Sequence, residues 1–306
     1  MKPQEKPELM VFHSISELHK AVGVAPPKHP LIGVIRFSDM QPRFPLLERQ
    51  IRYDFYKVSF IEHAESKIGY GQRYYDFSEG GLCFIGPNQV ITDDGVSHGL
   101  TGLAFYFHPD LLAKHPLAQK MKQYRFFGYE LSEALHLSEK EKAIITNIFR
   151  QIEEELDSSI DGFSQDLLIS YIELLLNYSN RFYNRQFLTR KVANNDLLDK
   201  VDQLLTNYFD DGEAQRTGLP TVQFLAQQLH MSPDYLSDML RAYTGQSTQQ
   251  HIQTKLIEKA RELLLNTDLS TAEVAYALGF EHPQSFNRIF KKKMDVSPME
   301  FRQSFN

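Results

Sequence analysis

The chain has 306 residues, of which 42% are hydrophobic and 24% are charged, and its formal net charge is −6. These values are ordinary for a soluble globular protein, and the length is sufficient for two domains. The net charge neither favours nor excludes binding to nucleic acid, because such binding needs a local basic patch. The single cysteine, Cys83, excludes an intramolecular disulfide bond, and the apolar run around it indicates a core position.

No apolar run of the sequence approaches the roughly 20 residues of a membrane span. The N-terminal residues Met-Lys-Pro-Gln-Glu-Lys-Pro-Glu lack the apolar core of a signal peptide. We therefore expect a cytoplasmic protein with no membrane partner.

The first 30 residues hold several prolines and little periodicity, and we expect an N-terminal arm with at most one short helix within 9–22. After residue 30, short runs rich in β-branched and aromatic residues alternate with clusters of Gly, Asn, Asp and Pro. Several short strands at this spacing predict a β-sandwich or barrel. The expected strands are 31–37, 53–62, 67–75, 82–85, 89–92 and 99–107, followed by a short helix that Pro109 begins.

The apolar period becomes helical from Ser138, which together with Glu141 fits a capping box. A second helix is expected over 163–183, with a broad apolar stripe. The stripe either packs wholly within its own domain or forms part of a dimer seam, and the sequence leaves both open. Polar residues 185–195 are interpreted as a linker. The stripe consists of Leu167, Leu168, Tyr171, Leu174, Leu175 and Tyr178.

Residues 196–306 begin with an amphipathic helix over 196–209 and then contain one two-helix pattern twice. In the second copy, Ser270 caps a short helix and Gly279 ends it, since only glycine adopts the left-handed cap conformation at little cost. Pro283 then begins another helix, as proline often does. This arrangement is typical of a helix-turn-helix motif with a recognition helix.

The first copy has a matching order of signals. Thr221 caps a helix over 222–229, and Ser232 and Pro233 begin the next. A long helix over 248–266 joins the copies, and its 19 residues span about 28 Å. This length is close to the roughly 34 Å of one turn of B-DNA, so both recognition helices would reach successive major-groove segments.

These elements closely resemble the C-terminal domain of AraC/XylS-type bacterial transcription regulators over about 196–305. The resemblance is carried by 259–265, 274–280, 285–292 and 297–302. The β-rich part resembles the cupin-like barrel of the family's sugar-sensing members. The resemblance implies an α+β protein with an arm (1–30), a cupin-like domain (31–184), a linker (185–195) and a double helix-turn-helix domain (196–306).

The resemblance also implies a function without catalysis or cofactors. The expected partners are double-stranded promoter DNA, a small-molecule effector in the barrel, a second copy of the chain and, for an activator, RNA polymerase. A ligand-independent regulator whose barrel only dimerises is an alternative, and a cupin-type enzyme is a further one.

In the second motif, amide and guanidinium groups are suited to base edges, and lysines are suited to phosphates. Alone, these residues would favour an ordinary solvated helix face, whereas the doubled motif favours base contact. The family's recognition positions fall on Gln284, Asn287 and Arg288 for bases, with Lys291, Lys292 and Ser285 for phosphates.

In the first motif, the corresponding positions are Asp234 and Ser237 for bases and Arg241 for a phosphate. Here the sequence departs from the family, because Asp238 stands where a basic residue is frequent, and phosphates repel a carboxylate. The segment from 196 onward holds 11 Lys and Arg and 15 Asp and Glu, a net charge of −4. From 281 onward, 5 basic and 3 acidic residues give +2, so we expect the second motif to read most bases.

The β-rich region has no His-x-His pair with a following carboxylate, so we expect no metal. A barrel interior can hold one ligand. Arg36, Lys57 and Arg73 are candidates to bind a polar effector, although each is more often a surface residue.

Overall fold

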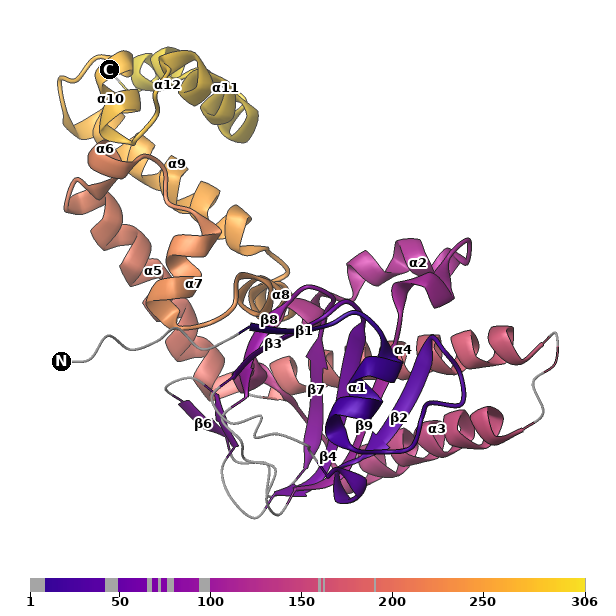
Figure 1. The fold of residues 1–306 in the computed structure, drawn as a ribbon. Helices are drawn as coiled ribbons and strands as arrows, with labels where there is room; N and C mark the ends of the chain where they lie inside the picture. The colour runs from indigo at the N-terminus through magenta and orange to yellow at the C-terminus, as the bar shows by residue number, and fades with distance from the viewer. Residues whose placement is uncertain are drawn as a thin grey trace. The chain divides into compact units, whose positions relative to one another are not determined.

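The computed structural model describes residues 9–41, 49–64, 68–70, 73–75, 80–93, 100–158, 161, 163–189 and 191–305. The chain divides into two compact units, Met1–Gln186 and Phe187–Asn306 (Figure 1). All strands of the described residues lie in the first unit, and the second unit is helical. The predicted α+β class with a helical C-terminal region is confirmed.

A five-stranded antiparallel sheet forms the centre of the first unit, with the order β10-β7-β4-β9-β2. The alternation of side chains along a strand sends apolar residues to both faces. Phe105 lies on one face, and Ala104 and Tyr106 lie on the other, so both faces need a cover. The strands are β2 (Ile32–Arg36), β4 (Tyr56–Ala64), β7 (Gly81–Ile85), β9 (Leu100–Phe107) and β10 (Leu135–His136).

One face is covered by a three-stranded sheet of order β1-β3-β8, in which β1 pairs parallel to β3. A helix, α1 (Ile15–Val22), packs into the same core, which includes Ile35, Ile51 and Tyr106. The strands are β1 (Leu9–Phe12), β3 (Arg49–Tyr53) and β8 (Val90–Asp93), and a separate hairpin joins β5 (Ile68–Tyr70) to β6 (Arg73–Tyr75).

The segment 9–22, where the sequence predicts one short helix beside an arm, forms part of the core of the first unit. Ser14 caps α1 with a 3.2 Å bond from the Glu17 N–H, and Ile15 and Leu18 are at most 3% exposed. Burial of these apolar side chains stabilises the segment as part of the core, a pairing that local sequence does not reveal. The short helix within 9–22 is confirmed.

The other face of the large sheet is covered by helices. Phe149 of α3 (Glu139–Asp157) lies 5.9 Å from Phe60 and 6.0 Å from Phe105 between ring centroids. The capping box of Ser138 and Glu141 is confirmed.

Short turns connect β9 to β10, and the first is the helix predicted at Pro109. They are η2 (Pro109–Leu112), α2 (Pro116–Lys120), η3 (Met121–Gln123), η4 (Arg125–Gly128) and η5 (Leu131–Glu133), while η1 (Phe37–Asp39) follows β2.

The second long helix, α4 (Ser164–Thr189), divides the predicted apolar stripe. Leu168 and Leu175 are buried, whereas Leu167 and Leu174 are 45% and 42% exposed. Residues 185–189 complete α4 and α5 (Lys191–Asp210) begins two residues later, so the described part of 185–195 is helical.

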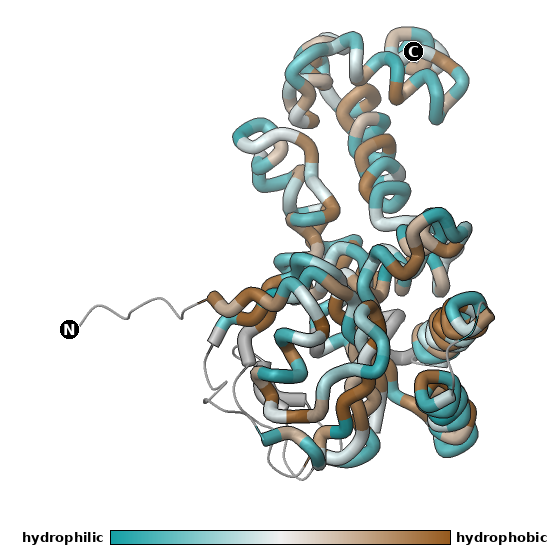
Figure 2. Tube along the Cα trace, turned by 45° about the vertical axis from the view of Figure 1, so that its right-hand side comes forward, coloured by the Kyte–Doolittle hydropathy of each residue, from teal (hydrophilic) through white to brown (hydrophobic). Residues whose placement is uncertain are grey.

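The second unit is built on a continuous apolar core from Tyr208 to Phe301. Brown and teal alternate along its helices in Figure 2, as expected where each helix buries one side. The predicted ranges 222–229 and 248–266 are confirmed, and a short helix within 210–218 was not predicted. The helices are α6 (Glu213–Thr217), α7 (Val222–Leu229), α8 (Pro233–Thr244), α9 (Thr248–Asn266), α10 (Thr271–Ala277), α11 (Pro283–Met294) and α12 (Pro298–Gln303).

The strands form three separate sheets within the described residues, and hydrogen bonding does not close them into one barrel. None of the helices described is both long enough and apolar enough to cross a membrane. In the same part of the chain, no three His, Cys, Asp or Glu side chains gather as they would around a metal ion.

Candidate nucleic-acid interface

The second helix-turn-helix consists of α10, the turn at 278–282 and α11. Ser270 Oγ accepts a bond of 3.2 Å from the Glu273 N–H, and the Glu273 carboxylate accepts one of 2.7 Å from the Ser270 N–H. These bonds satisfy two backbone donors that a helix start leaves without partners. The same bonds to Ser270 lower the pKa of Glu273. Phe286 and Phe290 are fully buried and fix the inner face of α11.

The turn depends on Gly279 for two reasons. Its φ of +88° lies in the left-handed region, which costs other residues free energy. A Cβ at this position would also lie 2.6 Å from the Ala214 carbonyl oxygen and 2.8 Å from the Gly218 carbonyl carbon. The turn therefore packs directly on the backbone around α6.

The outer face of α11 brings the predicted contact residues together. Gln284, Asn287, Arg288, Lys291 and Lys292 are all exposed, and within the described residues none has a side-chain hydrogen bond or ion pair. They lie at spacings of three and four residues, which place them on one side of a helix. Ser285 is half-buried at the edge of this face. The face presents amide, guanidinium and ammonium groups to solvent.

The first motif presents a different face on α8. Ser237 is 6% exposed, and its hydroxyl oxygen lies 3.1 Å from that of the buried Thr248. The structure therefore argues against Ser237 as a base contact. Asp234 is half-buried. Arg241 is exposed but lies 3.7 Å from the Asp238 carboxylate, which reduces the positive charge offered to a phosphate.

The turn of the first motif also differs, because His230 takes the place of Gly279. Its φ is +56°, and its backbone N–H donates to the Gln227 carbonyl at 3.1 Å. A non-glycine residue in this conformation is strained. The two motifs thus share an architecture but not the same turn chemistry.

The long helix α9 is attached to α5 by two lysines. Lys255 Nζ lies 2.7 Å from the Asp202 carboxylate, and Lys259 Nζ lies 2.6 Å from that of Asp210. The hydrogen bond with Asp210 raises the pKa of Lys259. These lysines are engaged within the unit, and they do not add to the positive charge that α11 offers to solvent.

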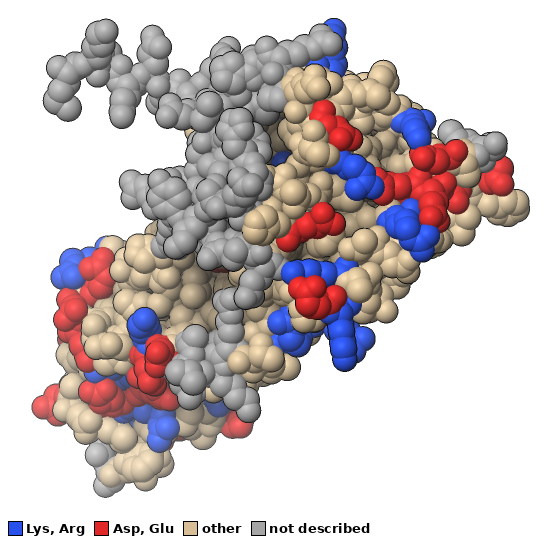
Figure 3. Space-filling view, turned by 90° about the horizontal axis from the view of Figure 1, so that it is seen from below, with Lys and Arg blue, Asp and Glu red and all other residues tan. Residues whose placement is uncertain are grey.

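The distribution of charge on another face of the molecule differs from that on α11. On the face drawn in Figure 3, Lys and Arg side chains lie beside Asp and Glu side chains. By contrast, α11 carries Arg288 and three consecutive lysines at 291–293, with no acidic residue. A local patch of one sign is what electrostatic attraction to phosphates requires.

Of the candidate effector residues of the first unit, the structure does not bring Arg36 and Lys57 into one site. Arg36 donates to Glu153 at 2.7 Å, on the side of the sheet covered by α3. Lys57 Nζ lies 5.5 Å from the ring centroid of Tyr53, among aromatic side chains between the sheets. The Arg73 side chain lies outside the described residues.

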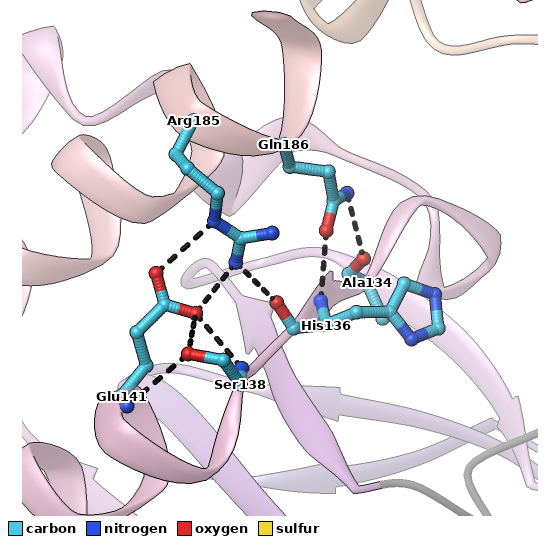
Figure 4. Close-up of polar contacts among 6 residues, drawn as sticks. All are labelled: Ala134, His136, Ser138, Glu141, Arg185 and Gln186. Atoms are coloured by element: carbon cyan, nitrogen blue, oxygen red, sulfur yellow. Dashed lines mark hydrogen bonds and ion pairs between the residues drawn. The ribbon is translucent and has the colours of Figure 1, made fainter. Parts of the chain in front are cut away.

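The end of α4 is attached to the first unit by contacts that the sequence did not predict. Arg185 donates to the Glu141 carboxylate at 2.7 and 3.1 Å and to the His136 carbonyl at 2.7 Å (Figure 4). Gln186 accepts from the His136 N–H at 2.9 Å and donates to the Ala134 carbonyl at 3.2 Å. Glu141 is the N3 residue of the capping box of α3, so the sequence predicted its contact with Ser138 but not its contact with Arg185.

Comparison with known proteins gives matches to the C-terminal unit and to most of the chain. The helix-turn-helix domain family matches residues 225–304. The transcriptional activator RhaS of Enterobacter sp. (strain 638) is 23% identical over 266 residues, which covers 86% of this chain and 91% of RhaS. The C-terminal domain of the response regulator yesN from Fusobacterium nucleatum is 33% identical; the match covers 33% of this chain and 95% of that domain, with a TM-score of 0.29.

Residues 225–304 therefore hold an AraC-type helix-turn-helix domain, and most of the chain resembles AraC/XylS-type transcription regulators. Another relative is an uncharacterized HTH-type transcriptional regulator, YfiF of Bacillus subtilis, which is 25% identical over 259 residues, 83% of this chain and 78% of YfiF. These matches identify a DNA-binding transcription regulator, and the relatives are regulators, not enzymes.

Proposed function

We propose that this transcription regulator reads promoter DNA chiefly through α11. Gln284 and Asn287 suit adenine edges, and Arg288 suits guanine, to which it can donate two parallel bonds. Lys291 and Lys292 suit phosphates, with Ser285 beside them. The observation that carries the proposal is that these charged and amide groups share one solvent-facing side and form no side-chain hydrogen bond or ion pair within the described residues.

The first motif has a supporting role in this proposal. Arg241 is its phosphate contact, and Asp234 can accept only from a cytosine amino group. With Ser237 buried and Asp238 beside Arg241, α8 contributes few base contacts. The affinity of one chain for DNA is then modest, and two chains on adjacent half-sites raise it by effective concentration.

The test compares Arg288→Ala with Lys292→Ala on an operator selected from a random-sequence DNA pool. We expect Arg288→Ala to weaken binding to the selected site by about 1–3 kcal/mol and to relax the preference at one base pair. Lys292→Ala should weaken all sequences alike and reduce the salt slope by about one charge. Equal binding by wild type and Arg288→Ala removes Arg288 from base reading.

The first unit is proposed to bind a small-molecule effector. An effector shifts the population of conformations only by its differential affinity for them, and the shift would change how the DNA-binding units are presented. A cavity in the first unit supports this role. A cupin-like arrangement of the first unit is part of this proposal, and two sheets that share one core support it.

A second candidate is a ligand-independent regulator whose first unit only dimerises. The side chains between the two sheets favour it, because Tyr53, Phe55 and Tyr106 are each at most 4% exposed and fill that space. DNA affinity measured with and without ligand separates the two. The homodimer is common to both candidates, and the exposed Leu167 and Leu174 of α4 support it.

A further inference from the structure

A cavity of about 200 Å³ lies in the second unit, between α5 and α9. Its volume is below the roughly 300–1,000 Å³ of sites for drug-sized ligands, so it suits a small aliphatic molecule. None of the residues that we propose for DNA contact belongs to its lining. The lining consists of Leu198, Val201, Asp202 and Leu205 of α5 and of His251, Thr254, Lys255 and Glu258 of α9.

The wall on α5 is mainly apolar. Leu198, Val201 and Leu205 follow one another at spacings of three and four residues, which place them on one side of the helix. Val201 and Leu205 are each 2% exposed, and Leu198 is half-buried. Covering the remaining exposed part of this wall is favourable, so the wall can hold an alkyl chain.

The wall on α9 is polar. His251, Thr254 and Glu258 have the same spacing as the apolar residues of α5, so they also share one side of their helix. Thr254 and Glu258 are exposed, and within the described residues neither side chain makes a hydrogen bond. The cavity therefore offers hydrogen-bonding groups along one wall and hydrocarbon along the other.

His251 carries an acceptor that no described residue uses. Its Nε2 lies 3.0 Å from the hydroxyl oxygen of Thr244, and that hydroxyl donates to the Leu240 carbonyl at 2.7 Å. Nε2 must then hold the hydrogen of this pair, and burial lowers the pKa of His251, so the ring is neutral. Nδ1 is a lone pair within reach of solvent, because it is not one of the buried unpaired atoms of the described residues.

Glu258 is the carboxylate of the cavity with the more distant partner. Lys255 Nζ lies 2.7 Å from the Asp202 carboxylate but 3.9 Å from that of Glu258, which is beyond hydrogen-bond distance. The neighbouring Lys259 lies within 2.9 Å of a carboxylate on each helix. Glu258 is 56% exposed, so a ligand can reach it.

The charge of the lining favours a cation. Two carboxylates, one ammonium group and a neutral imidazole give a net charge of −1. An anionic ligand would double this charge, whereas a monocation would neutralise it. An ammonium group has three donors and no acceptor, which matches a wall of free acceptors.

We propose that this cavity binds a small aliphatic amine, whose ammonium group donates to Glu258 and whose alkyl chain lies on α5. Residues 251 and 258 are about 10 Å apart along α9, so a second donor on the same chain can reach His251 Nδ1. Diamines and amino alcohols have this chemistry. The site goes beyond the proposed function, because it lies in the DNA-binding unit and takes a ligand of its own.

The experiment measures thermal shifts of the full chain without DNA, at fixed pH and ionic strength, with millimolar pentylamine and cadaverine. Pentanol and pentanoate are the uncharged and anionic analogues of the same chain length. Calorimetry then compares Glu258→Gln with Glu262→Gln as the matched control. Glu262 is also on α9, pairs with Lys259 and is 54% exposed, but it lies outside the cavity. Both positions are exposed, so both variants should fold.

We expect the amines to raise the melting temperature and the two analogues to leave it unchanged. The affinity for cadaverine should fall about tenfold in Glu258→Gln and stay unchanged in Glu262→Gln. In isotope-edited NMR of the wild type, the methylene protons of the bound amine should show Overhauser contacts to the Leu198 methyl groups. No shift with either amine, an equal shift with pentanol, equal losses in the two variants, or no contact with Leu198 overturns the site.

Discussion

Gly279 determines the geometry of the turn in the second motif. Its positive φ allows the turn between α10 and α11, and its missing Cβ allows contact with the backbone of α6. The turn sets the direction of α11, so the exposed face of that helix depends on a residue that would itself touch no base.

Replacement of Gly279 by alanine tests whether the close backbone contact adds to the strain that alanine meets at any left-handed helix end. We expect Gly279→Ala to destabilise the C-terminal unit by about 2–4 kcal/mol, because backbone clashes add to the left-handed strain. Gly245 has φ +76° and nothing within 4 Å of its Cβ position, so Gly245→Ala should cost only about 1–2 kcal/mol. Urea denaturation of both variants measures the difference; equal losses would argue against the close approach.

Cys83 lies buried in the core of the first unit. Burial raises the pKa of its thiol to about 12, so almost no thiolate forms at neutral pH. We expect no reaction with Ellman's reagent at pH 8 in the folded protein and full reaction in guanidinium chloride. Rapid labelling of the native chain would show that β7 opens far more easily than its burial implies.

At the scale of elements, the C-terminal end of α4 is held by the Arg185 and Gln186 contacts to α3 and β10. Both residues stand at the boundary between the units. A rigid attachment at this point keeps the last turn of α4 in a fixed relation to the large sheet, because β10 pairs with β7.

We expect Arg185→Ala to destabilise the N-terminal unit by about 1–2 kcal/mol, since it leaves the Glu141 carboxylate, 13% exposed, without its cation. Arg150→Ala is the control: it removes an ion pair with Glu154 in which both side chains are more than half exposed, and it should change stability by less than about 0.5 kcal/mol. Denaturation curves of both variants provide the comparison. Similar values for the two would mean that the Arg185 contacts contribute no more than a surface pair.

At the scale of the whole molecule, the proposed homodimer depends on the outer side of α4. Leu167 and Leu174 are seven residues apart, and Tyr171 and Tyr178 lie half-buried beside them. This spacing repeats every two helical turns and is typical of a helix seam. The sequence left the stripe undivided, and the structure assigns Leu168 and Leu175 to the core.

We expect Leu174→Glu to raise the dimer dissociation constant about tenfold or more, because a charge would be buried in the seam. Leu265→Glu is the matched control, since Leu265 on α9 is also 42% exposed but does not belong to this stripe. Sedimentation equilibrium of both variants measures their dimer dissociation constants. An unchanged monomer–dimer equilibrium in Leu174→Glu would exclude α4 as the seam.

The sequence by itself determined the elements whose signals are local. Capping residues, glycine stops and a helical apolar period act within a few residues, so they placed α7, α9 and the capping box at Ser138 correctly. Spacing alone also identified the exposed side chains of α11, because residues three and four apart lie on the same side of a helix.

Only the tertiary structure decided what depends on contacts between distant segments. Residues 9–12 pair with β3, α1 packs into the core beside them, and Ser237 is buried against Thr248. Arg185, the partner of Glu141, lies 44 residues further along the chain, and α1, β2 and α3 together line the cavity of the first unit. Apolar burial and hydrogen bonding between such segments have no sequence period, so their outcome follows from packing and not from local pattern.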